Sequence, residues 1–190
     1  MKHFITVIVM IVCSGVCLAQ DYYNGKTTVS GGGITYEIYK VTSGGVFVEN
    51  INNTLRHQEK MFDDGTKFYP AQTPVYTVCQ NDDIIDEIVR RNVPESVLKR
   101  MKETKSGLMI DARVSPKTEK AVEIGYWLNK PYDQTVNGAC AISPSSLAAI
   151  ERELKEKLVF KCSRKDLNYT VSILYSSKAP GNCASLHDDE

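Results

Sequence analysis

The chain has 190 residues, with 23 basic and 23 acidic side chains, 42% apolar residues and 8% aromatic residues. The length favours one domain or two small ones, and the apolar fraction and balanced charge argue against a disordered chain. A net charge of zero also argues against nucleic acid as a partner, because phosphate binding needs a surplus of Lys and Arg on one face.

Residues 1–19 have the pattern of a secretory signal peptide. Lys2 gives a positive start, and the mainly apolar stretch that follows is shorter than the roughly 20 residues that span a bilayer as a helix. Cys17 and Ala19 form a small-residue cleavage pattern, so we expect cleavage after Ala19, with a lipid anchor on Cys13 or Cys17 as the alternative. The sequence therefore predicts export to the periplasm or the extracellular space, with no stable membrane span after cleavage.

Export decides how the cysteines are interpreted. Cleavage leaves Cys79, Cys140, Cys162 and Cys183. In an oxidising compartment these four residues allow three disulfide pairings, between which the sequence does not choose. Buried free thiols are the other interpretation. No C-x-x-C pair supports a metal site, and we expect no metal and no other cofactor.

The first part of the mature chain is expected to be a flexible lead-in (20–33) followed by a β-rich part (34–80). Alternating apolar residues predict a strand at 34–39 and a partner at 46–49, joined by a glycine-containing turn. Asp64-Gly65 predicts a second hairpin within 61–69, and residues 75–78 fit a short edge strand.

Residues 81–177 are expected to form an α+β part with the order helix, strand, strand, helix, strand. Asn81 or Asp82 is a candidate cap for a helix that Pro94 divides in two and that stops at Ser106-Gly107. Two alternating strands follow, with the core residues Leu108, Ile110, Ala112 and Val114 on the first and Val122, Ile124, Tyr126 and Leu128 on the second.

Ser143-Pro144 predicts the start of the next helix, whose apolar stripe is Leu147, Ile150, Leu154 and Leu158. The pairs Glu151/Lys155 and Glu153/Lys157 are expected on its solvent side. A closing strand at 169–175 precedes an irregular tail (178–190). The fold class is α+β: an antiparallel sheet (hairpin plus closing strand) covered on one face by helices, with a β-rich N-terminal part beside it.

Residues 108–176 resemble the carboxy-terminal domain of TonB-type energy transducers. The resemblance lies in a strand hairpin (MIDARVSPKTEKAVEIGYWL), a helix (SPSSLAAIERELKEKLVF) and a closing strand (YTVSILYS). It implies the fold and not energy coupling, because no proline-rich spacer precedes the segment. The whole chain resembles small secreted Bacteroidetes proteins of unknown function, which implies an envelope or extracellular location.

No set of residues with a catalytic pattern stands out. His57-x-Glu59 has the spacing of zinc deaminases but lacks their P-C-x-x-C partner. Asp82-Asp83 and Asp86-Glu87 complement a helix dipole, and Asp63-Asp64-Gly65 fits a turn. We therefore expect a protein that is not an enzyme; the alternative is a small secreted hydrolase that uses scattered carboxylates.

The chain has ten tyrosines and one tryptophan, residue types that are favoured in interfaces because they bury a large area and keep a polar group. Four tyrosines are expected at the edge of the core: Tyr36, Tyr126, Tyr169 and Tyr175. Trp127, Met109 and Tyr39 are expected on the sheet face away from the core, where a partner covers them. The predicted function is an exported non-catalytic binding or accessory module with a protein or glycan partner. A structural subunit that pairs through its sheet edge is the third possibility.

Overall fold

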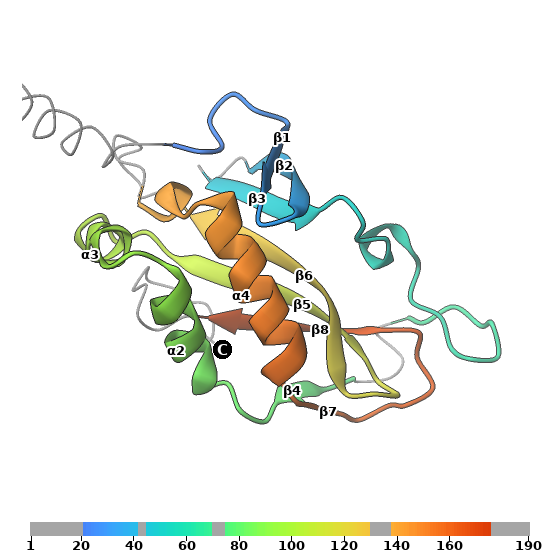
Figure 1. The fold of residues 1–190 in the computed structure, drawn as a ribbon. Coiled ribbons are helices and arrows are strands. Elements are labelled where there is room, and N and C mark those ends of the chain that lie inside the picture. The colour runs from blue at the N-terminus through green and yellow to red at the C-terminus, as the bar shows by residue number, and fades with distance from the viewer. Residues whose placement is uncertain (1–20, 42–44, 70–74, 130–137, 176–190) are drawn as a thin grey trace, which may run out of the picture.

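A computed structural model describes residues 21–41, 45–69, 75–129 and 138–175. The expected signal peptide, Cys183 and the expected tail lie outside these ranges. The described chain is α+β, with a six-stranded antiparallel sheet of order β1-β2-β3-β6-β5-β8 and a two-stranded sheet β4-β7 (Figure 1). The strands are β1 (Thr28–Gly31), β2 (Ile34–Val41), β3 (Gly45–Asn50), β4 (Thr77–Cys79), β5 (Leu108–Ser115), β6 (Lys120–Asn129), β7 (Phe160–Cys162) and β8 (Thr170–Tyr175).

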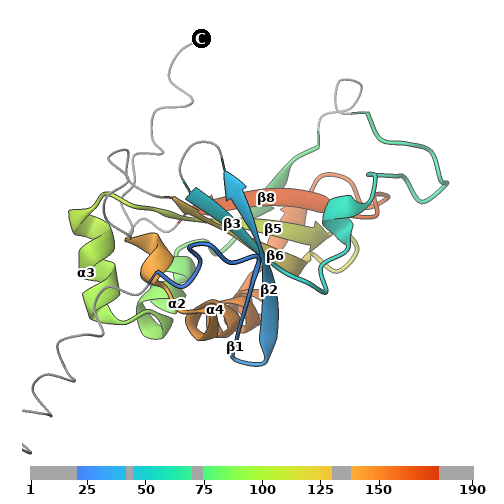
Figure 2. The ribbon, with the colours of Figure 1, turned by 90° about the horizontal axis from the view of Figure 1, so that it is seen from above.

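Three α-helices cover one face of the large sheet, which we call the inner face; the opposite face is the outer face (Figure 2). The helices are α2 (Ile84–Asn92), α3 (Glu95–Glu103) and α4 (Pro144–Lys157), with short 3-10 turns η1 (Leu55–His57) and η2 (Ala139–Ala141). The predicted helical break at Pro94 is confirmed, and the predicted helix, strand, strand, helix and strand occur in that order. The structure adds β7 between α4 and β8, which was not predicted.

The expected lead-in contains a strand, which corrects the prediction for residues 20–33. β1 pairs with β2, and Val29 lies opposite Tyr36 on the inner face. One apolar residue among polar ones gives no period of two, so the sequence pattern did not reveal the strand. Gly31 is needed here because a Cβ atom would lie 2.5 Å from the Ser145 backbone nitrogen at the start of α4.

The predicted β2-β3 hairpin is confirmed, and the residues around Gly65 form a turn with a bridge between Met61 and Lys67 instead of a regular hairpin. The short strand expected at 75–78 is β4, which pairs with β7 in a sheet of its own. Neither Asn81 nor Asp82 caps α2. Asn81 instead binds the end of α4: its side chain donates to the Lys157 carbonyl at 3.0 Å and accepts from the Val159 amide at 3.0 Å.

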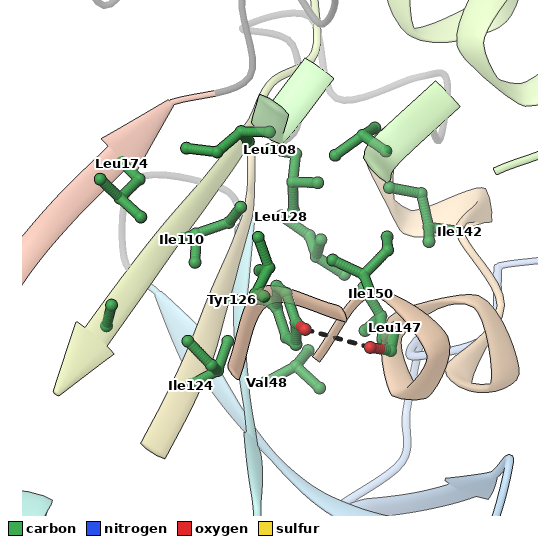
Figure 3. Packing of buried hydrophobic residues seen from close by; sticks show 14 of the residues in the cluster. Val48, Leu108, Ile110, Ile124, Tyr126, Leu128, Ile142, Leu147, Ile150 and Leu174 are labelled. Atoms are coloured by element: carbon green, nitrogen blue, oxygen red, sulfur yellow. Dashed lines mark hydrogen bonds between the residues drawn. The ribbon is translucent and has the colours of Figure 1, made fainter. Parts of the chain in front are cut away.

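The core lies between the inner face and α4. The predicted N-cap Ser143 accepts a hydrogen bond from the Ser146 amide at 3.0 Å, and the predicted apolar stripe of α4 is fully buried. Facing it are side chains of β3, β5, β6 and β8, and the Tyr126 hydroxyl donates to the Leu147 carbonyl at 3.0 Å (Figure 3). This hydrogen bond satisfies the one polar atom of the Tyr126 side chain, so its ring fills the core without an unpaired group.

Glu151 was expected on the solvent side of α4, and this was wrong. Its side chain is buried between α4 and the sheet, where it accepts hydrogen bonds from the Tyr36 hydroxyl at 3.0 Å and the Asn50 amide at 3.3 Å. Lys155 pairs with it at 2.7 Å. The i,i+4 spacing predicted the Glu151–Lys155 pair, but the exposed position was wrong because β2 and β3 extend the sheet beneath the helix.

Two strands differ from the predicted faces. A bulge between Arg113 and Val114 places Ala121, not Val122, opposite Val114, so Val122 is exposed. In β8 the inner face carries Thr170, Ser172 and Leu174, whereas Ile173 and Tyr175 are exposed on the outer side. The sequence alternates with apolar residues on what proves to be the outer side, so the predicted core position of Tyr175 was wrong.

Candidate functional site

A row of five apolar side chains crosses the outer face at one end of the sheet. Each residue lies opposite the next in the strand register, on β2, β3, β6, β5 and β8 in turn. We call it the outer-face row, and its members are Tyr39, Phe47, Trp127, Met109 and Tyr175. The three residues predicted for a partner-binding face (Trp127, Met109 and Tyr39) are thus brought together, and Phe47 and Tyr175 join them.

Phe47 anchors the row. It is 1% exposed although it lies on the outer face, and its ring centroid is 4.7 Å from that of Trp127 and 6.2 Å from that of Tyr39. Its ring lies over Gly125, where an added Cβ would come within 2.5 Å of the ring. The Arg56 guanidinium lies 4.4 Å from the ring centroids of both Phe47 and Tyr39, a distance at which cation–π attraction operates.

A cluster of charged side chains lies beside the outer-face row. Glu49 is buried and pairs with two guanidiniums, with Arg113 at 3.1 Å and with Arg56 at 3.0 Å. Arg113 also approaches Asp111 at 3.5 Å. Since Arg56 contacts both the aromatic rings and Glu49, it links the cluster to the outer-face row.

Asp111 is the least satisfied member of this cluster. Its Oδ1 atom is buried without a hydrogen-bond partner among the described residues. Burial raises the pKa of the Asp111 carboxyl, and nearby Arg113 opposes that rise. Burial also lowers the pKa of Lys60, and the charge of the Asp111 carboxylate opposes that decrease. The site thus holds an acid and a base that are both partly removed from water.

The chain between β3 and β4 covers the other end of the outer face. Glu123 accepts hydrogen bonds from the backbone amides of Thr54 at 2.6 Å and Leu55 at 3.0 Å, and the Asn53 amide donates to the Ile124 carbonyl at 3.0 Å. The Tyr169 hydroxyl donates to the Gln58 carbonyl at 2.9 Å. Among the described residues of this segment, Arg56 is the one whose side chain lies over rings of the outer-face row.

A pocket of about 310 Å³ adjoins the row. Glu37 and Glu49 lie opposite each other across β2 and β3 and both line it, together with Tyr39, Asn53 and His57. The Tyr39 hydroxyl donates to Glu37 at 2.6 Å, and this hydrogen bond raises the pKa of Tyr39 to about 12. The pocket therefore places two carboxylates and a phenol at one end of the row.

The remaining sequence candidates lie apart. His57 is on η1 and lines the pocket, whereas Glu59 pairs with Lys67. Asp82, Asp83 and Asp86 line a separate hollow beside β8. No group of three or more His, Cys, Asp or Glu residues in the described ranges is arranged to hold a metal ion.

The structure describes three of the four cysteines of the expected mature chain. Cys79, Cys140 and Cys162 form no disulfide with one another. Cys140 is buried in the core, whereas the Cys79 and Cys162 thiols lie near Asn81 and Thr170 at 3.8 and 3.7 Å. The interpretation as buried thiols fits these positions; Cys183 is outside the described ranges.

Sequence reasoning missed Phe47, Arg56 and Asp111 as members of the site. Phe47 alternates with the buried Val46 and Val48, which was the available signal for its outward position. Arg56 comes from a loop, and only the path of that loop over the sheet brings it to the row. Within the described residues, no helix has the length and apolar character that a membrane span requires.

Comparisons with known proteins give a structural likeness. No family model and no curated protein matches the sequence. A solved structure of a DUF5043 family protein from Bacteroides uniformis ATCC 8492 matches with a TM-score of 0.60 and 24% identity, covering 81% of this chain and 86% of that chain. This likeness establishes the fold alone, and its source is consistent with the resemblance to uncharacterised Bacteroidetes proteins. The resemblance of residues 108–176 to TonB carboxy-terminal domains gains no support from these comparisons.

Proposed function

We propose that the protein is an exported, non-catalytic binding module that holds a protein partner on the outer-face row. The observation that carries this proposal is the in-register arrangement of Tyr39, Phe47, Trp127, Met109 and Tyr175 across five strands. All three described α-helices lie on the other face of the sheet (Figure 2).

The composition of the row favours a protein as the partner. Tyr, Trp, Met and Arg are the residue types that protein interfaces enrich, and Trp, Tyr and Arg supply most energetic hot spots. Here Arg56 lies against Tyr39 and Phe47, and Trp127 lies against Phe47. Phe47 is already packed within the protein, so Trp127 is held in place before any partner arrives, which reduces the entropy lost on binding.

The test compares partner capture by the mature protein and its variants in the envelope fraction and culture medium of the producing cells. We expect Trp127→Ala to abolish capture, because truncating a central aromatic anchor removes about 2 kcal/mol or more of binding energy. Tyr76→Ala is the matched control, since Tyr76 is 67% exposed and lies outside the row. Thermal unfolding of both variants checks that the fold is retained.

Hydrogen exchange of the purified complex then locates the contact. We expect slower amide exchange in β2, β3, β6 and β5 around the row when the partner is bound. A partner that Trp127→Ala binds as well as the original protein, with no protection on the outer face, would contradict the proposal. Selective capture of a glycan in place of a protein would assign the row to the other partner class.

One observation supports a hydrolase as the second candidate. Glu37 and Glu49 lie opposite each other in one pocket, and paired carboxylates carry out glycoside hydrolysis. However, two arginines bind Glu49, and Tyr39 binds Glu37. The test is hydrolysis of a panel of chromogenic glycosides, where a rate that Glu37→Gln removes would favour the hydrolase over the binding module.

A further inference from the structure

The two edges of the six-stranded sheet differ. At one edge, β1 has four residues and packs against the start of α4, where Gly31 allows the close approach. At the other edge, β8 pairs with β5 on one side, and no described strand of the sheet pairs with its other side. The small sheet lies near the start of β8, where Cys162 contacts Thr170, so the edge beside the hollow is that of Ile173, Leu174 and Tyr175. An edge strand of this kind presents backbone N–H and C=O groups to an incoming chain.

A hollow lies directly along the end of this edge. It has a volume of about 320 Å³, with Ile173, Leu174 and Tyr175 of β8 on one side. Ile173 is 42% exposed and Tyr175 is 53% exposed. The other side is formed by Asp82 and Asp83, which precede α2, and by Ile85 and Asp86 of its first turn.

The charge of the hollow is one-sided. Among the described residues that line it, three are aspartates and none is Lys or Arg. Asp82 and Asp83 are exposed. A negative wall beside an open strand edge favours a positively charged chain, because complementary charge speeds encounter and selects the partner.

We propose that the free edge of β8 is a second binding site, which takes an extended basic segment of another protein as a seventh strand. Backbone hydrogen bonds to β8 hold the segment, as in other cases of strand addition. Because side chains of a strand alternate between faces, basic residues at every second position reach Asp82 and Asp83. The intervening apolar residues lie beside Ile173 and Tyr175 on the outer side.

A second copy of this chain fits the edge less well. Pairing β8 with β8 around a two-fold axis would place the same acidic wall of each copy at one contact. The wall would repel its own copy, whereas a basic strand neutralises it. The proposal goes beyond the outer-face row, because it concerns a different surface that meets the row only at Tyr175.

The first experiment measures fluorescence anisotropy of a labelled ten-residue probe peptide that alternates lysine with valine. We expect binding to the mature protein, and a roughly tenfold weaker affinity for the double variant Asp82→Asn/Asp83→Asn, because two wall charges are removed. The control is Asp63→Asn/Asp64→Asn, which removes two adjacent exposed carboxylates from a distant turn. Equal weakening by both double variants, or by neither, would overturn the proposal.

The second experiment separates strand addition from simple charge attraction. Two versions of the probe are prepared, with backbone N-methyl groups on every lysine or on every valine. In a strand, alternate amides point to opposite edges, so one version loses binding about tenfold and the other retains it. Equal affinity of the two versions, whether retained or lost, would refute pairing with β8.

Controls then separate this site from the outer-face row and from self-association. Trp127→Ala leaves probe binding unchanged, because Trp127 does not line the hollow. If Trp127→Ala loses its captured partner but binds the probe normally, the defect lies in the outer-face row and not at the β8 edge. Light scattering measures self-association. A dimer that Asp82→Lys dissociates would mean that a second copy of this chain occupies the edge in place of a basic partner, and would overturn the inference.

Discussion

The inner and outer faces of the six-stranded sheet are formed by the same strands, but they differ in how far their buried polar groups are satisfied. On the inner face, buried polar groups such as the Tyr126 hydroxyl and the Glu151 carboxylate have hydrogen-bond partners within the fold. On the outer face, a buried oxygen of Asp111 has no hydrogen-bond partner among the described residues, and Trp127 is only partly buried by them. The fold therefore satisfies these polar groups of the inner face, whereas the outer face retains groups that an external molecule can contact.

The largest expected effect is on the charged cluster of the outer face. Replacing Arg113 with Met leaves Glu49 and Asp111 close together with less compensating charge. Removing one partner from a buried ion pair lowers the free energy of unfolding by about 3–5 kcal/mol. Urea unfolding measures this loss. Adding Glu49→Gln should restore part of it, and strict additivity of the two changes would contradict the expected coupling.

The inner face gives the next largest effect. Leu154→Ala removes a fully buried side chain from the α4 stripe, and such a change lowers the free energy of unfolding by about 2–5 kcal/mol. The control is Val159→Ala, since Val159 is 40% exposed and should change stability by only about 0.5 kcal/mol. Similar losses for both variants in thermal or urea unfolding would show that α4 does not cover the core.

A third change tests how tightly the outer face is packed. Gly125→Ala adds a methyl group where the Phe47 ring lies, and overpacking of this kind destabilises by about 1–3 kcal/mol. We also expect the tryptophan fluorescence to change, because Phe47 contacts Trp127. In the double variant with Phe47→Leu, the added methyl group should be tolerated better. An unchanged stability of Gly125→Ala would mean that Phe47 is free to move away.

The smallest effect is a pH dependence at Asp111. Burial raises the pKa of this carboxyl in the folded protein, so the folded state binds the proton more tightly than the unfolded state does. The associated stability is present below the ordinary pKa of 3.8 and is lost as the pH rises through the folded pKa. Asp111→Asn should therefore gain stability relative to the original protein as the pH rises over this range.

The control for this pH dependence has the opposite sign. Arg164 lowers the pKa of Asp166, so the small stabilisation from that carboxylate is present above its ordinary pKa and is lost as the pH falls. Urea unfolding of Asp111→Asn and Asp166→Asn at several pH values compares the two. Parallel pH profiles for both variants would contradict the difference in environment.

Part of the candidate site was predictable because alternation decides which residues share a face. Tyr39, Met109 and Trp127 each sit between inward-facing neighbours in a strand with period two, and pairing of those strands then brings them into one row. Tyr175 was misplaced because the apolar residues of β8 lie on its outer side. In such a strand, the neighbouring strands and helices decide which side is buried, and the strand's own pattern of apolar residues does not.

The break at Pro94, the Ser143 cap, the apolar stripe of α4 and the main elements after residue 81 could be predicted from the amino-acid sequence, because these depend on residues near one another in the chain. The existence of β1 and β7, the burial of Glu151 and the contact of Arg56 with Phe47 became known from the folded structure. Each of these contacts joins segments whose meeting depends on the register of the sheet and the path of a loop. Local periodicity contains no information about either.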